Sequence, residues 1–164
     1  MRWIPTLVVA LLACGTDDPP ADPPNDCVAR SSTPPAAHAH TDGGGAYTGK
    51  PCLESGCHQI GAPGAGTTAF ITGGTVVTPD GQPQAGITVR LRPLDNSPPT
   101  LLVTDTGGTF FIRVGATNPF PATPEVTACP KVARMLEAPP DSGNCNGTDC
   151  HIANGHAGPI ILEN

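Results

Sequence analysis

The sequence AFITGGTVVTPDG, residues 69–81, is the most strongly patterned stretch of this 164-residue chain. It contains two runs rich in Thr, Val and aromatic side chains, residues 69–72 and 75–78, which favour β-strands. Between them, Gly73 and Gly74 predict a β-bulge. The stretch ends in Pro-Asp-Gly, where Pro fixes φ and Gly accepts positive φ. The pattern therefore predicts two strand segments joined by a bulge and followed by a turn.

More strands are predicted directly after this stretch. Residues 87–92 alternate apolar and polar side chains, as a half-buried strand does. Residues 101–104 and 109–114 favour two further strands, joined by the turn sequence Asp-Thr-Gly-Gly. Short strands separated by Gly and Pro predict an all-β fold, a small β-sandwich. On the last of these strands Phe110 and Ile112 share one face, which we expect to be the core, while Phe111 points the other way.

The pattern is looser in the C-terminal part of the chain, where three prolines fall between residues 118 and 125. Residues 125–129 are expected to form one more strand. Residues 132–136 are compatible with a strand or with a short turn of helix. Residues 160–162 are expected to form a last edge strand.

The central segment resembles the carboxypeptidase regulatory-like domain. The residues that carry the resemblance are 74–77, 80–83, 85–89 and 104–110, within a region of about residues 70–128. The resemblance implies a prealbumin-like, immunoglobulin-like sandwich that usually serves as a non-catalytic scaffold or adhesive module. The family name does not imply peptidase activity.

Two copies of a Cys-x4-Cys-His motif flank this segment, CLESGCH at 52–58 and CNGTDCH at 145–151. Each resembles the attachment site of c-type haem, in which two thiols form thioethers and the adjacent imidazole ligates the iron. Four residues between the cysteines resemble the variant site of small multihaem cytochromes. The resemblance implies two covalent c haems, with the attachment residues Cys52, Cys57, Cys145 and Cys150 and the proximal iron ligands His58 and His151.

Two other kinds of cross-link are compatible with the same residues. In an exported chain Cys52–Cys57 and Cys145–Cys150 could each form a disulfide that closes a small loop. Thiolates and imidazoles are also normal zinc ligands, and zinc ligand pairs tolerate two to four intervening residues. A disulfide, however, does not explain why His follows the second Cys in both copies.

Three further histidines are candidates for the second axial positions. His38 and His40 precede the first motif and could fold back onto it, with Met135 as another candidate. His156 is five residues beyond His151, a connection too short to pass easily around a haem plane, so it would serve the other haem or a partner. The alternative for all of these side chains is plain exposure to solvent.

The N-terminal residues predict export and a lipid anchor. Residues 1–13 combine a basic end with an apolar run too short for a permanent membrane span, as in a signal peptide. Leu-Leu-Ala before Cys14 resembles the lipobox of bacterial lipoproteins, which implies diacylation of Cys14 and anchoring in the outer membrane, facing the periplasm or the surface. The alternative is an ordinary cleaved signal and a soluble periplasmic protein.

A tether is predicted at residues 14–51, which are rich in Pro, Gly and Asp and poor in apolar side chains. Such a segment is expected to be extended and mobile. Cys27 lies in it, and Cys129 is its one unassigned partner. A disulfide between the two, which the sequence leaves open, would attach the tether to the domain. The remaining segments are the first Cys-His site at 52–68, the sandwich at 69–128, and the second site with the C-terminal strand at 129–164.

Composition excludes several functions. The chain has a net charge of −6, and −7 once residues 1–13 are removed with Arg2, so it has no basic cluster for nucleic acid. No Ser/His/Asp order, carboxylate pair or nucleotide loop indicates an enzyme. The sequence therefore predicts a lipid-anchored, c-type cytochrome-like electron-transfer protein with a redox partner protein. The alternative is a non-catalytic structural or adhesive surface lipoprotein stabilised by disulfides.

Overall fold

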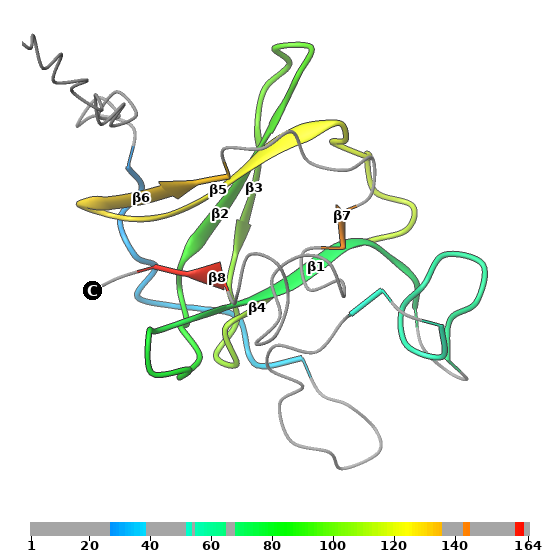
Figure 1. Cartoon of the computed structure of the whole chain (residues 1–164), viewed down its shortest axis with the longest axis horizontal. Coiled ribbons are helices and arrows are strands. Elements are labelled where there is room, and N and C mark those ends of the chain that lie inside the picture. The colour runs from blue at the N-terminus through cyan, green and yellow to red at the C-terminus, as the bar shows by residue number, and fades with distance from the viewer. Residues whose placement is uncertain are drawn as a thin grey trace, which may run out of the picture.

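The computed structural model of the chain describes residues 27–38, 52–53, 55–64, 68–135, 143–144 and 160–162. Within these residues every regular element is a β-strand, and the strands form two sheets (Figure 1). The described part contains no helix that is long and apolar enough to span a membrane. The all-β prediction and the β-sandwich architecture are confirmed.

The first sheet is built around β1, Phe70–Val77. It pairs in antiparallel fashion with β4, Thr109–Arg113. Two short strands, β7 at Gly143–Asn144 and β8 at Ile160–Ile161, run parallel to β1 and pair with it at different points along its length.

The second sheet is antiparallel throughout and has the strand order β3-β2-β5-β6. Its central strands are β2, Thr88–Pro93, and β5, Ala122–Ala128. They are flanked by β3, Thr100–Val103, and by β6, Lys131–Arg134, which forms a hairpin with β5. The alternative of a helical turn at 132–136 is therefore replaced by a strand.

The core lies between the two sheets and is made of aliphatic side chains and one aromatic ring. Phe110 and Ile112 are 2 % and 6 % exposed and belong to it, whereas Phe111 lies on the other face of β4 and is half-buried. The predicted core face of β4 is thus confirmed. The other buried members are Val76, Ile87, Val89, Leu91, Ala122, Val126 and Leu162.

The predicted bulge at Gly73 and Gly74 is wrong. These glycines pair in register with Phe111 and Phe110, and the register shift occurs between Phe70 and Thr72. Gly73 serves a different purpose, because a Cβ atom there would lie 3.2 Å from the Cβ atom of Cys52. The glycine lets the first Cys-His segment pass close over the strand.

The strand predicted at 125–129 begins earlier, at Ala122, so that β5 includes Pro124. The carbonyl of Pro124 accepts a hydrogen bond from the Met135 N–H at 3.0 Å, on the side of β6. The N and C=O of one strand residue point to the same side, so the missing donor of Pro124 faces away from β2. The ladder between β2 and β5 therefore loses no hydrogen bond.

Residues 27–38, which we call the strap, run along one end of the sandwich without regular secondary structure (blue in Figure 1). The Cys27–Cys129 disulfide that the sequence left open is formed. Backbone hydrogen bonds then attach the strap to the β1–β2 connection and to the β3–β4 turn, at Ser31 N–H to Gly86 O and at Thr106 N–H to Pro35 O, 2.8 and 2.9 Å.

This attachment corrects the expectation of a mobile tether for residues 27–38. That expectation rested on low apolar content, which measures how much surface a segment can bury. The strap is held instead by a covalent bond and by backbone hydrogen bonds, and composition does not report either. The other residues of the predicted tether lie outside the described part of the chain.

Candidate functional site

The first Cys-His motif lies in a compact loop that leads directly into β1. The His58 N–H donates to the Cys52 carbonyl at 3.1 Å, and the Gly64 N–H donates to the Cys57 carbonyl at 2.9 Å. At the end of the loop the Phe70 N–H donates to the His58 carbonyl at 2.9 Å. These bonds close the loop and connect His58 to the start of β1.

Cys52 and Cys57 are not bonded to each other, so the Cys52–Cys57 disulfide that was one alternative is not formed in this structure. Cys57 is exposed and Cys52 is half-buried. Among the described cysteines, Cys27 and Cys129 are joined by a disulfide across the fold.

His58 is oriented by a hydrogen bond and by stacking. Its Nδ1 lies 2.6 Å from the Thr68 carbonyl oxygen. Because a carbonyl only accepts, Nδ1 carries the proton, and in the neutral ring Nε2 keeps the lone pair. The ring stacks on Phe70 with centroids 3.8 Å apart and planes 6° apart. Stacking covers a face of the ring, whereas the lone pair of Nε2 lies in the ring plane.

The His58 ring belongs to an aromatic cluster on the face of the first sheet opposite the core. The other members of the cluster are His38, Phe70 and Phe111. Phe70 and Phe111 stack at 4.5 Å with planes 9° apart. The guanidinium of Arg113 lies 5.6 Å from the centroid of the Phe111 ring. The alternation of side chains on this strand directs Phe111 away from the core. An aromatic residue on the outer face of a strand was therefore the feature of the sequence from which this cluster could have been predicted.

His38 enters the cluster from the strap. Its ring centroid lies 5.5 Å from that of His58 and 5.0 Å from that of Phe111. Its backbone N–H donates to a carboxylate oxygen of Asp105 at 2.8 Å. Of the two tether histidines that the sequence offered for this site, His38 is therefore beside His58, whereas His40 lies outside the described residues.

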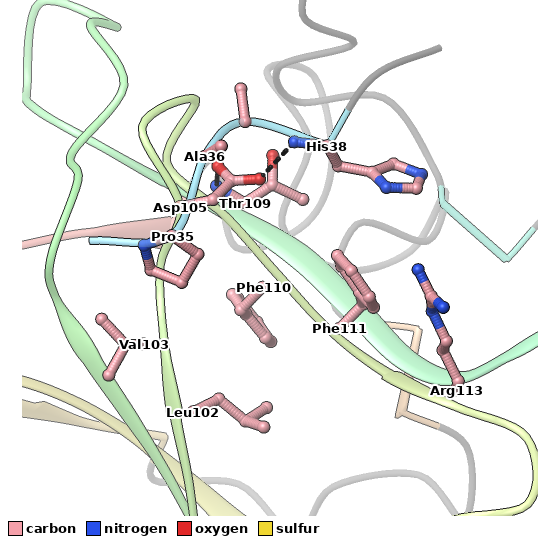
Figure 2. Close-up of a pocket in the computed structure, with 11 residues that line it drawn as sticks. Pro35, Ala36, His38, Leu102, Val103, Asp105, Thr109, Phe110, Phe111 and Arg113 are labelled. Atoms are coloured by element: carbon pink, nitrogen blue, oxygen red, sulfur yellow. Dashed lines mark hydrogen bonds between the residues drawn. The ribbon is translucent and has the colours of Figure 1, made fainter. Parts of the chain in front are cut away.

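A pocket of about 400 Å³ lies next to the cluster, between the strap and the edge strands β3 and β4 (Figure 2). Its walls are mainly apolar, and Arg113 and Asp105 supply its charged groups. Asp105 is 4 % exposed and already accepts hydrogen bonds from the backbone of Gly107, Thr109 and His38. Its role is to hold the β3–β4 turn and the end of the strap together.

The motif suggests two cofactors, haem and zinc, which need different sets of donor atoms. Covalent haem attachment uses the sulfur atoms of two cysteines and an imidazole nitrogen, and Cys52, Cys57 and His58 are residues of these types within one loop. Zinc needs about four ligands around one point. Among the described residues there is no group of three or more His, Cys, Asp or Glu side chains placed to hold a metal ion.

The other predicted site residues lie outside the described part of the chain. These are the lipidation residue Cys14, the second motif with Cys145, Cys150 and His151, and the candidate ligands His40 and His156. The two residues before the second motif are described as β7, which pairs with Thr72 and Gly73. Gly73 is also the residue that Cys52 approaches, so β7 and the first motif lie at the same part of β1.

The described fold places the chain among small all-β sandwich proteins, with a Cys-His loop on the outer face of one sheet. Comparisons of the chain with protein-family models, with curated proteins and with solved structures find no match.

Proposed function

We propose that this protein is an exported, c-type cytochrome-like electron-transfer protein. Cys52 and Cys57 would hold a haem covalently, and His58 would ligate its iron. The observation that carries the proposal is the Nδ1–H···O=C bond from His58 to Thr68, which orients the ring of the histidine that directly follows Cys57. Bound haem supplies reversible one-electron redox chemistry.

The residues around the motif have defined tasks in this proposal. Thr68 fixes the tautomer of His58, and a ligating histidine usually has such a second hydrogen bond. Phe70 holds the ring in one orientation by parallel stacking. The sandwich is the rigid scaffold, a role in keeping with the resemblance to the carboxypeptidase regulatory-like domain. The second motif, by the same residue types, would take a second haem.

Several observations support an oxidising compartment. The Cys27–Cys129 disulfide joins residues 102 positions apart, and such bonds persist mainly outside the cytoplasm. This agrees with a signal peptide at 1–13 and a lipid anchor on Cys14. We propose that the protein is held at the outer membrane and exchanges electrons with a redox partner protein.

The second candidate is a structural or adhesive lipoprotein without haem. One observation favours it, because His58 is 6 % exposed and stacks on Phe70 as a structural histidine would. In that case the Cys-His loop would serve to cover the outer face of the first sheet.

Intact mass and absorbance distinguish the two candidates. The full chain is produced together with a c-type haem maturation system, and its mass is measured before and after reduction. Haem bound by thioethers survives reduction, whereas a disulfide-linked group does not. We expect a coloured protein with the mass of the polypeptide plus haem. The double variant Cys52→Ser, Cys57→Ser should lose one haem.

The matched control removes the other pair of described cysteines. Cys27→Ser with Cys129→Ser should keep the haem content of the parent, because these residues form the disulfide. A full-length, colourless protein of polypeptide mass alone would refute the cytochrome proposal and leave the structural candidate.

A further inference from the structure

We propose that the pocket between the strap and the edge strands β3 and β4 binds a small organic acid. The apolar body of the acid would lie against the pocket walls, and its single carboxylate would bind the guanidinium of Arg113, which lines the same pocket. The binding of such an acid goes beyond the proposed electron transfer and does not depend on haem.

The pocket has the size and the walls of a small-molecule site. Its volume of about 400 Å³ falls within the range of about 300–1,000 Å³ that such sites occupy. Leu102 and Phe110 line it from the two sheets, and Pro35 lines it from the strap (Figure 2). Transfer of an apolar body from water onto these side chains is favourable, so the walls select a ligand with an apolar part.

The pocket is accessible because both sheets end beside it. In the part of the chain that the structure describes, β3 is the terminal strand of the second sheet and β4 is the terminal strand of the first. Val103, which lines the pocket from β3, is 37 % exposed. A ligand can therefore reach the walls without displacing a strand.

Arg113 supplies the positive charge of the pocket. It is an exposed residue at the end of β4, and its guanidinium carbon lies 5.6 Å from the centroid of the Phe111 ring. Within the described residues no carboxylate forms an ion pair with Arg113, whereas the three arginines around Glu125 are all in ion pairs. The planar guanidinium can donate two parallel hydrogen bonds to the two oxygens of a carboxylate.

Asp105 limits the negative charge that the ligand can carry. One of its carboxylate oxygens accepts from the backbone N–H groups of Gly107 and Thr109 at 2.8 and 2.9 Å, and the other accepts from the backbone N–H of His38 at 2.8 Å. Its negative charge in the wall disfavours a second charge on the ligand, while Arg113 repels a cation. Figure 2 shows Asp105 well apart from Arg113, which lies beyond Phe111. The two charged residues together therefore favour a monoanion.

An NMR titration of the full, isotope-labelled chain with phenylacetate tests the site. We expect saturable shifts of the backbone amides of Leu102, Val103 and Phe111, which line the pocket. Phenylacetamide has a similar apolar body without the charge, and it should bind at least about 10-fold more weakly because the charge-assisted hydrogen bonds are lost. Acetate, which lacks the apolar body, should also bind more weakly.

Two variants and one matched control locate the effect. Arg113→Gln should weaken the binding of phenylacetate at least about 10-fold. Lys131→Gln, the control, removes the same charge from β6 at the edge of the other sheet and should bind phenylacetate like the parent protein. Val103→Asp places a second carboxylate in the pocket wall and should abolish the binding. Urea unfolding of each variant shows that it is folded.

Three results would each overturn the assignment of this site. The first is a parent protein that shows no saturable shifts at the pocket residues. The second is equal affinity for phenylacetate and phenylacetamide. The third is an equal loss of affinity in Arg113→Gln and Lys131→Gln, because the effect would then come from the net charge of the chain. The haem content measured by intact mass is independent of all three, so the failure of either proposal can be told from the failure of the other.

Discussion

The outer faces of the two sheets bury polar groups in different ways. On the second sheet the carboxylate of Glu125 is fully buried and is paired with Arg90, Arg92 and Arg134, with N–O distances of 2.5, 3.2 and 2.9 Å. On the first sheet the imidazole of His58 is buried among aromatic rings and a second imidazole. The ion network around Glu125 connects β2, β5 and β6. The cluster on the first sheet gathers groups that can ligate a metal.

The two outer faces differ in how freely their side chains can be changed. Breaking the Glu125 network would leave buried charge without compensation, so that face has little freedom to change. The cluster on the first sheet depends on stacking and single hydrogen bonds. The strap connects the two faces, since Cys27 at its start is bonded to Cys129 beside β5 and β6, and His38 at its end lies beside His58.

Removing the strap's covalent anchor should have the largest effect. The Cys27–Cys129 disulfide closes a loop with a sequence separation of 102. A loop of that length corresponds to about 4–5 kcal/mol of lost unfolded-state entropy. We expect Cys27→Ser with Cys129→Ser to lower the free energy of unfolding by about that amount, measured by urea denaturation. Addition of a reductant to the parent protein should have the same effect, and a loss below about 1 kcal/mol would mean that the strap does not depend on the bond.

Breaking the ion network should have the next largest effect. Glu125→Gln leaves Arg90, which is 7 % exposed, without its buried charge partner. Removal of one partner of a buried pair typically costs about 3–5 kcal/mol, and we expect a loss near 3 because Gln still accepts a hydrogen bond. The control is Arg92→Ala, whose side chain is 36 % exposed and should matter much less. Equal losses for the two variants would contradict the distinction.

Thinning the aromatic cluster should cost less than either. We expect Phe111→Leu to lower the free energy of unfolding by about 1 kcal/mol, because it removes the stacking with Phe70 and the contact with His38 but keeps apolar bulk. Phe110→Ala, on the core face of the same strand, should cost about 3–5 kcal/mol. If the Phe111 variant proved the more damaging of the two in urea unfolding, the assignment of the two faces would be reversed.

The smallest effect concerns an exposed carboxylate in the β2–β3 loop. The Ser97 backbone N–H bonds Asp95 at 2.9 Å and holds the pKa of that carboxyl below its ordinary value, with the Ser97 side chain acting in the same direction. A lowered pKa in the folded state gives stability that is present above the unfolded-state pKa and is lost as pH falls through the folded value. An NMR titration should place Asp95 below its ordinary pKa, and Ser97→Pro, which removes the N–H, should raise it. An unchanged titration in that variant would exclude the backbone bond as the cause.

Much of the fold could be predicted because it depends on local patterns. The strands at 87–92, 101–104 and 109–114 are found within one residue of their expected limits, because side-chain alternation and turn residues act over a few positions. The core face of β4 followed from the same alternation. The start of β5 was missed, because the place of Pro124 depends on which neighbour faces its missing N–H.

The candidate site divides in the same way. The sequence by itself determined the Cys-His motif, the strand positions and the two orientations of Phe110 and Phe111, since each depends on residues adjacent in the chain. Only the tertiary structure decided that the strap closes onto Cys129, that Gly73 makes room for Cys52, and that His38 lies beside His58. Those contacts join segments between 20 and 102 positions apart. Their formation depends on which surfaces the packed sheets present to each other, and no local pattern of side chains contains that information.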